Sequence, residues 1–424
     1  MRRHFLPLCL LTVCLGVVQS PARAQSGPPE RIGQLPPLFP TDNWWNQDVT
    51  GALVDPRSAQ FIAFIGTTRR LHPDFGGYES PGSANVYGFP YLTVPGNQPK
   101  RAVEFYYGDE SDGVDHASNR SYPFYPIPDE AIGQPYWIEG GPAGNQDPGG
   151  DRHMLIVDRD NRVLYELYDL HWNGSQWTGG SGAAFDLKVT GRRPDGWTSA
   201  DAAGLAILPG LVRYDEVVGS DEIRHAFRVT VRATNGYVYP ASHRAGSNSS
   251  ALPMGARLRL KASKDLSSFH PAVQRIFRAF QRYGLIVADN GSDMYVSGTF
   301  DPRWDNDILN PAFASLTASD FDVIELGWRG TVGTPCSPLG TPSPFNISVS
   351  GRFVVLTWAG VAGASDYLIE VGSLAGASDL LVAPLGNITS VSTYADPRLY
   401  YARIKARNGC GVSAPSNEVA VRIF

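Results

Sequence analysis

The sequence predicts a mainly β protein, in which a jelly-roll-like β-sandwich with a few helices is followed by a second, smaller β-sandwich. Apolar and polar residues alternate with period two in many short segments, as in strands that bury one face. Gly and Pro account for 45 and 33 of the 424 residues, which favours a loop-rich β protein over a helical bundle. The central part has no internal repeat at the periods typical of propellers and solenoids, which disfavours both.

Residues 1–24 have the pattern of a signal peptide. Arg2 and Arg3 precede an apolar run at residues 5–18, and Ala22 and Ala24 give the small-x-small pattern of a cleavage site. The run is too short to span a bilayer comfortably, and no later stretch is apolar enough for a transmembrane anchor. We therefore expect a secreted protein, extracellular or periplasmic.

Length and charge limit the organisation and the partners of the chain. With 36 Lys and Arg against 41 Asp and Glu, its net charge is −5, so it lacks the basic character that nucleic acid or anionic lipid requires. The chain is too long for one typical core, and we expect a monomer with two domains. The predicted parts are a signal peptide (1–24), a flexible proline-rich segment (25–40), a central β-rich domain (41–330), a linker (331–341) and a C-terminal module (342–424).

The C-terminal module contains a regular series of short strands. They are expected at residues 353–358, 367–371, 400–406 and 417–421, with turn signals at residues 413–416. This segment resembles the fibronectin type III modules of bacterial proteins. Trp358, Tyr367 and Tyr401 stand where that family places core aromatic residues. The resemblance implies a spacer or adhesion role.

Two cysteines, Cys336 and Cys410, remain after the predicted cleavage. Two thiols in an oxidising compartment usually pair. In type III modules the start of the first strand and the loop before the last strand lie at the same end, and the two cysteines fall at those places. We therefore expect a disulfide between Cys336 and Cys410.

Helix signals occur at two places in the central domain. Asp55 and Pro56 begin a short helix that should end near Gly66. Residues 269–283 place apolar side chains at the helical period, and Gly284 is a stop signal. We expect both helices to support the packing of the sheets.

Two histidines stand in otherwise apolar strand faces. His225 belongs to the predicted strand 222–232, and His153 precedes a predicted hairpin whose second strand is 163–169. An even-length turn would set His153 opposite Glu166, whereas an odd one would move Glu166 to the other face. The turn type therefore decides whether these two side chains meet.

His153, Glu166 and His225, with Asp169 just beyond, are the candidate catalytic residues. An imidazole and a carboxylate in a low-dielectric cleft could transfer protons, with Glu166 as the principal carboxylate. His153 and His225 could equally hold a divalent metal with an open position, the one cofactor that the sequence suggests. In a third interpretation, each histidine is half-buried and structural.

Aromatic residues are dense around this predicted strand pair. Trp172 and Trp177 follow the second strand, and Trp197 comes shortly afterwards. Flat rings stack on sugar faces, which makes these tryptophans candidate substrate-binding residues, although tryptophan is also an ordinary core residue of a sandwich. In a secreted β protein with a type III module, they favour a polysaccharide or other glycan as the ligand.

Acidic residues gather at 289–293 and 301–307. Paired carboxylates could run glycoside hydrolysis, and oxygen-rich loops could bind Ca²⁺, although the EF-hand spacing is absent. The third interpretation is turn formation without a ligand.

Much of the central domain is similar to an uncharacterised group of secreted bacterial proteins. The similar blocks are residues 151–168, 195–214, 222–227 and 289–305. The resemblance supports treating these blocks as one domain and implies no mechanism.

The motifs of several enzyme classes are absent. There is no Gly-x-Ser-x-Gly, His-Glu-x-x-His, phosphate-loop or dinucleotide motif, which disfavours serine esterases, zincins and nucleotide enzymes. We expect a secreted carbohydrate-active protein that cleaves glycosidic bonds of an extracellular polysaccharide, using Glu166, with His153 as its partner and His225 as an orienting group. The alternatives are a non-catalytic protein that binds a glycan or a protein, and a metal-dependent hydrolase.

Overall fold

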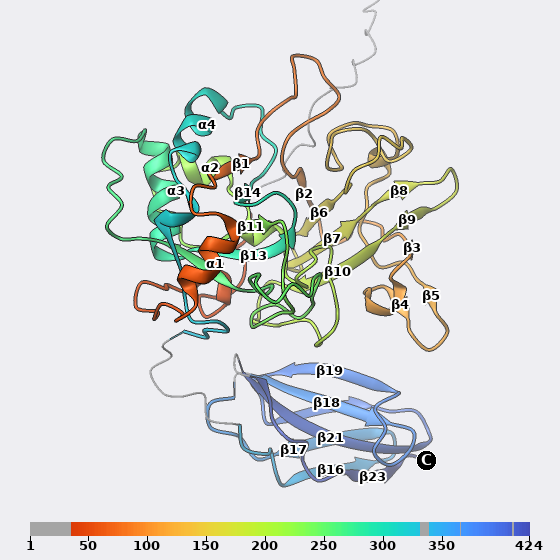
Figure 1. The fold of residues 1–424 in the computed structure, drawn as a ribbon. Helices are drawn as coiled ribbons and strands as arrows, with labels where there is room; N and C mark the ends of the chain where they lie inside the picture. The colour runs from red at the N-terminus through yellow and green to blue at the C-terminus, as the bar shows by residue number, and fades with distance from the viewer. Residues whose placement is uncertain (1–34, 331–338, 365, 409–410) are drawn as a thin grey trace, which may run out of the picture.

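The computed structural model describes residues 35–330, 339–364, 366–408 and 411–424. These residues form several β-sheets and a few helices, which confirms the mainly β fold class (Figure 1). None of the helices in this part of the chain has the length and apolar character that a membrane span needs. The predicted signal peptide, Cys336 and Cys410 lie outside the described residues.

Both predicted helices are present. α1 (Ser58–Ile65) ends at Gly66, where a φ of 108° suits glycine. α3 (Pro271–Arg282) buries its apolar stripe, and His270 caps its first turn. The other helices are α2 (Tyr214–Val218), α4 (Asn306–Ala314), η1 (Trp44–Asn46), η2 (Gly108–Glu110), η3 (Asp129–Ile132), η4 (Leu208–Gly210) and η5 (Ala318–Asp320).

A six-stranded mixed sheet forms one side of the central region. Its strands in spatial order are β1 (His72–Asp74), β14 (Tyr295–Ser297), β11 (Phe227–Val231), β13 (Leu285–Asn290), β12 (Arg257–Leu260) and β15 (Phe321–Val323). β1 and β14 are parallel, as are β11 and β13, and the other pairs are antiparallel. β11 is shorter than the predicted strand 222–232, so His225 lies before it.

A four-stranded sheet forms the other side. Its strands in spatial order are β10 (Ser181–Asp186), β7 (Val163–Tyr168), β6 (Met154–Asp158) and β2 (Tyr91–Val94). β2 is parallel to β6, and β6 and β7 form the predicted hairpin. The short strands beside this sheet are β3 (Val103–Phe105), β9 (Trp177–Gly179), β8 (His171–Trp172), β4 (Val114–Asp115) and β5 (Arg120–Ser121).

The two larger sheets share one apolar core. Leu155 and Val157 from β6 belong to the same cluster as Val229 from β11, and Figure 1 shows the sheets that contain these strands next to each other. The opposite face of the four-stranded sheet covers a second cluster that includes Met154 and Ile156. The parallel pairs are a feature that an antiparallel jelly roll does not have.

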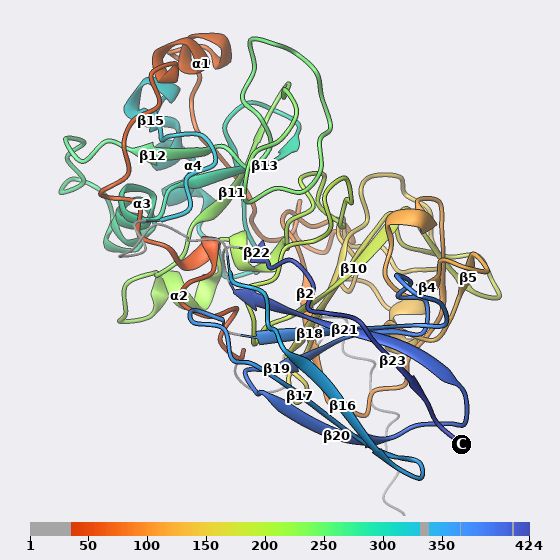
Figure 2. The ribbon, with the colours of Figure 1, turned by 90° about the horizontal axis from the view of Figure 1, so that it is seen from below.

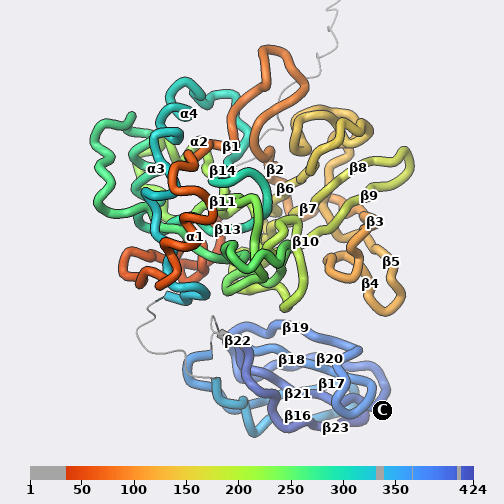
Figure 3. The backbone as a smooth tube through the Cα atoms, in the orientation of Figure 1, coloured from red at the N-terminus to blue at the C-terminus, as the bar shows by residue number. Residues whose placement is uncertain are grey.

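Long connections lie between these strands. Figure 3 traces residues 187–207, which run from β10 to η4 without helix or strand. The described end of the predicted flexible segment also packs against the protein, because Phe39 is buried in the shared core.

The C-terminal residues form two antiparallel sheets (Figure 2). One contains β16 (Phe345–Ser350), β17 (Phe353–Trp358) and β20 (Ser390–Tyr394), and the other contains β19 (Leu381–Gly386), β18 (Asp366–Gly372), β21 (Leu399–Asn408), β22 (Gly411–Val412) and β23 (Val419–Arg422). Trp358 and Tyr367 are buried between them, as expected. Tyr401 is not, because Tyr400 shares the inward face of β21 with Ala402 and Ile404.

Candidate active site

A cavity of about 350 Å³ lies where the chain before β6, the end of β13 and residues 198–202 meet. Most of the residues that line it have polar side chains, which suits a ligand that forms hydrogen bonds. The lining residues are Tyr107, Glu110, Asp151, His153, Tyr168, Ser181, Thr198, Ser199, Ala200, Ala202, His243, Asp289 and Asn290.

Both ring nitrogens of His153 contact oxygen atoms at this cavity. Nδ1 lies 2.5 Å from Oε2 of Glu139, and Nε2 lies 2.9 Å from the carbonyl oxygen of Ala200. Burial alone would lower the pKa of His153, but the carboxylate of Glu139 outweighs it and raises the pKa to about 9. His153 is therefore a buried cation at neutral pH, with no lone pair to accept a proton or bind a metal.

Glu139 is a site residue that the sequence reasoning missed. Burial would raise the pKa of its carboxyl group, but the His153 imidazolium holds it below its usual value. It lies in an irregular segment, 14 residues before its partner, with no motif around it. No sequence signal could have found this contact.

Arg228, on β11, is buried and contacts Asp289, one of the residues that line the cavity. Its guanidinium donates to Asp201 at 2.9 and 3.3 Å, to Asp289 at 3.0 Å and to the hydroxyl of Ser297 at 2.7 Å. Burial raises the pKa of Asp201 to about 6, although Arg228 opposes that shift. An arginine that donates four hydrogen bonds in this way fixes the carboxylates that surround it.

Asp151 and Asp289 line the same cavity in different environments. The carboxylate of Asp289 accepts hydrogen bonds from Arg228 and from the backbone amide of Asn290, at 3.0 and 2.7 Å. Asp151 is an exposed residue for which desolvation is the largest influence, and its pKa is raised. Besides Glu110, the cavity thus holds one carboxyl group whose pKa burial raises and one carboxylate bound to a cation.

Glu166 does not reach this cavity. It pairs with Leu155 across the hairpin, so it shares a face with His153 without lying opposite it. Its carboxylate is fully buried and accepts the backbone amides of Ile207 and Leu208, at 2.8 and 2.9 Å. Burial raises its pKa to about 7. These contacts attach the start of η4 to the sheet.

His225 and Asp169 also lie away from the cavity lining. His225 contacts the carbonyl oxygen of Ala226 at 2.8 Å and Oε2 of Glu216 at 3.1 Å. Asp169 has a φ of 55° and pairs with His171 at 2.8 Å. The predicted metal ligands His153 and His225 are therefore not brought together, and the described residues include no group of three side chains placed to hold a metal ion.

The three candidate tryptophans have different surroundings. Trp177 is buried in the second core cluster and packs edge-on against half-buried Trp172, with ring centroids 5.5 Å apart. Trp197 is half-buried, adjacent in sequence to the lining residue Thr198, and lies over the guanidinium of Arg193. Tyr107 and Tyr168 supply the aromatic rings of the lining itself.

The two acidic segments, residues 289–293 and 301–307, have different roles in the structure. Asp289 joins the cavity, whereas Asp305 caps α4 by accepting the amides of Asp307 and Ile308. The segment 301–307 thus serves a turn and a helix start, the interpretation without a ligand.

No protein-family model matches the chain, and no curated protein matches it. Solved structures similar to part of it include fibronectin type III domains. A two-domain segment of chicken tenascin is 14% identical over 20% of this chain and 51% of its own, with a TM-score of 0.19. A human collagen alpha-1(XX) domain is 22% identical, over 22% of this chain and 92% of its own, with a TM-score of 0.18. An Fn3-like protein from Clostridium thermocellum is 21% identical, over 21% of this chain and 96% of its own, with the same TM-score.

Proposed function

We propose that this protein is a secreted carbohydrate-active enzyme that cleaves glycosidic bonds in the cavity at Asp151 and Asp289. In this proposal Asp151 protonates the leaving oxygen, and Asp289 acts as the second carboxylate, either as nucleophile or as the base that activates water. Asp151 and Asp289 take the roles first expected for Glu166 and His225, which do not line the cavity, and His153 remains a nearby cation.

The single observation that carries the proposal is the contrast between the two carboxyl groups. Glycoside hydrolysis needs one group that holds a proton at working pH and another that stays ionised. Burial raises the pKa of Asp151 above its usual value, which is the direction that the first requirement needs. The hydrogen bonds from Arg228 and Asn290 to Asp289 stabilise a negative charge and fit the second.

The aromatic lining supports a sugar ligand. Tyr107 and Tyr168 both line the cavity, and Tyr107 is 45% exposed. Such rings stack on sugar faces and orient them at a low cost in side-chain entropy. A cavity of about 350 Å³ is enough for a sugar unit next to the carboxyl groups.

The test measures the release of reducing ends from a panel of polysaccharides by wild type, Asp151→Asn and Asp289→Asn. Each variant should lose at least about 100-fold in kcat, a typical contribution of general acid–base catalysis. Asp147→Asn is the matched control, because Asp147 is 81% exposed and does not line the cavity. Turnover by both site variants at the rate of the control would overturn the proposal.

A non-catalytic glycan-binding role is the second candidate. It is favoured by the exposed tyrosine at the cavity and by the fixed, fully hydrogen-bonded state of His153. In that case wild type and Asp151→Asn bind the same glycan, and neither releases reducing ends.

A further inference from the structure

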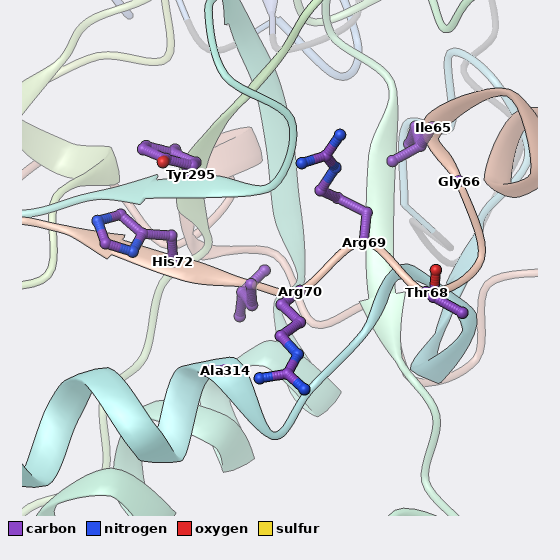
Figure 4. A pocket seen from close by; sticks show the side chains of 9 residues that line it. Ile65, Gly66, Thr68, Arg69, Arg70, His72, Tyr295 and Ala314 are labelled. Carbon is purple, nitrogen blue, oxygen red and sulfur yellow. The ribbon is translucent and has the colours of Figure 1, made fainter.

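A second cavity, of about 520 Å³, lies at the β1–β14 edge of the six-stranded sheet (Figure 4). It is formed by the chain that leaves α1, by the first residues of β1 and β14, and by the end of α4. Its lining residues are Ile65, Gly66, Thr68, Arg69, Arg70, Leu71, His72, Tyr295 and Ala314.

The charge of this cavity is opposite to that of the chain. Arg69, Arg70 and His72 line it, and none of the described lining residues is acidic, although the net charge of the whole chain is −5. Arg69 and Arg70 are exposed, and within the described residues neither has a carboxylate partner, whereas Arg228 and Arg303 each contact two. Guanidinium groups from two consecutive residues, each without a carboxylate partner among the described residues, favour an anionic ligand.

An aromatic surface lies beside these charges. The rings of His72 and Tyr295 are 4.3 Å apart between centroids, at an angle of 37°. Figure 4 shows Arg69 extending to the same side as Tyr295, and Arg70 extending to the opposite side, near the end of α4 at Ala314. A flat ring next to a guanidinium suits a sugar unit that carries an acidic group, because the ring contacts the sugar face and the guanidinium binds the anion.

The sheet connects this cavity to the one at Asp289. His72 pairs with Tyr295, Tyr295 pairs with Thr230, and Thr230 pairs with Asp289 on the next strand. Neighbouring strands lie about 4.8 Å apart, and Tyr295 and Asp289 are two strands apart. Their backbones are therefore separated by about 10 Å in total. Paired residues point to the same face of a sheet, so the side chains of Tyr295 and Asp289 lie on one face, although the β11–β13 register shifts between Val229 and Thr230.

We propose that the cavity at Arg69 and Arg70 binds a carboxylate or sulfate group of an acidic polysaccharide whose chain continues to Asp289. The continuation to Asp289 rests on the proposed function, but the anion site itself stands on its own lining and charge. The proposal makes an acidic glycan the ligand, with the guanidinium groups selecting it over a neutral one.

The test is a calorimetric titration of the full chain carrying Asp151→Asn, which prevents turnover in the proposed mechanism. The probes are tetragalacturonate for carboxylates, a heparin tetrasaccharide for sulfates, neutral cellotetraose and inorganic phosphate. The double variant Arg69→Gln/Arg70→Gln is compared with Arg398→Gln/Arg422→Gln, which removes the same charge from exposed positions in the C-terminal module. Circular dichroism melting checks that each variant is folded.

At least one acidic tetrasaccharide should bind, with an affinity about tenfold or more lower in Arg69→Gln/Arg70→Gln and unchanged in the control. Added salt should weaken the wild-type affinity. The proposal is overturned if neither acidic tetrasaccharide loses affinity in the double variant. It is also overturned if phosphate alone binds in an arginine-dependent manner, which would make this a site for free phosphate.

These results also separate the two proposals. Binding that depends on the arginines, together with no turnover of any polysaccharide by wild type, would support the anion site and contradict the glycosidase proposal. Turnover of neutral polysaccharides by wild type, with no change in binding in Arg69→Gln/Arg70→Gln, would support the glycosidase proposal and contradict the anion site.

Discussion

The Nδ1 atom of His153 lies 2.5 Å from Oε2 of Glu139, and this contact defines the protonation state at the candidate site. The second ring nitrogen faces the carbonyl oxygen of Ala200, which can only accept a hydrogen bond. Both nitrogens therefore carry protons, and the ring is an imidazolium. We infer that His153 contributes positive charge beside Asp151 and does not act as a base.

Glu139→Gln should destabilise the protein by about 3 kcal/mol, because removing one member of a buried ion pair leaves the other without compensation. The side chain of His153 is 4% exposed and that of Glu139 is 23% exposed, so solvent screens the pair only in part. Urea denaturation measures the change. Glu130→Gln, at an exposed position in η3, is the control, and an equally small effect of both variants would contradict the pairing.

The same pair predicts how stability depends on pH. The pKa of His153 is raised from 6.5 to about 9 in the folded state, so its contribution is fully present below pH 6.5 and is lost as the pH rises through 9. Burial also raises the pKa of Glu166 to about 7 and that of Asp201 to about 6, so ionisation of these two groups further lowers the free energy of unfolding as the pH rises.

The comparison with Glu139→Gln separates these contributions. The free energy of unfolding of wild type should fall between pH 6.5 and pH 9 by more than that of the variant, because only the wild type retains the carboxylate that raises the pKa of His153. Denaturation curves at several pH values in this range measure both slopes. Parallel slopes would show that His153 titrates in the same way in both proteins.

Glu166→Gln should lower the free energy of unfolding of the protein and leave kcat almost unchanged. Glutamine can accept only one of the two amides that the carboxylate now accepts, so an N–H group of η4 or its neighbour loses its partner, at a cost of about 1–3 kcal/mol. Denaturation and steady-state kinetics on the same samples check this. Unchanged stability with a large loss of kcat would restore Glu166 as the catalytic carboxylate.

The sequence was sufficient where local patterns decide the structure. The alternation at residues 353–358 and the apolar stripe of α3 each reflect one buried face, which single segments reveal. The even-length turn of the β6–β7 hairpin also placed Glu166 and His153 on one face, but the register paired Glu166 with Leu155.

The candidate site could not be predicted in the same way, because its contacts join distant segments. Arg228 meets Asp201 and Asp289 only after β11 and β13 pair in parallel, a pairing that no local signal specifies. His225 looked like a strand residue, yet β11 begins at Phe227, so alternation alone placed its side chain wrongly. Long-range pairing and unpatterned loops therefore determine most of the site.

The proposed role of Asp151 predicts the shape of the pH–rate profile. Because desolvation raises its pKa, the basic limb of kcat/KM should lie above the ordinary range of an aspartic acid. That limb should vanish from the residual activity of Asp151→Asn and persist in Asp147→Asn. A basic limb that is the same in all three proteins would assign the titration to another group.

The predicted linker at residues 331–341 should be the first site of limited proteolysis by a protease of broad specificity. The segment is rich in Gly, Pro, Ser and Thr, and the described residues on either side belong to separate apolar clusters. Mass spectrometry of the early fragments locates the cut.

Trp358 is the single tryptophan of the C-terminal fragment, and it is buried against Tyr367 and Phe345, so its fluorescence reports on that core alone. A blue-shifted emission that is retained after cleavage is expected for a module with its own core. An emission shifted to that of exposed tryptophan would show that the C-terminal sheets depend on the rest of the chain.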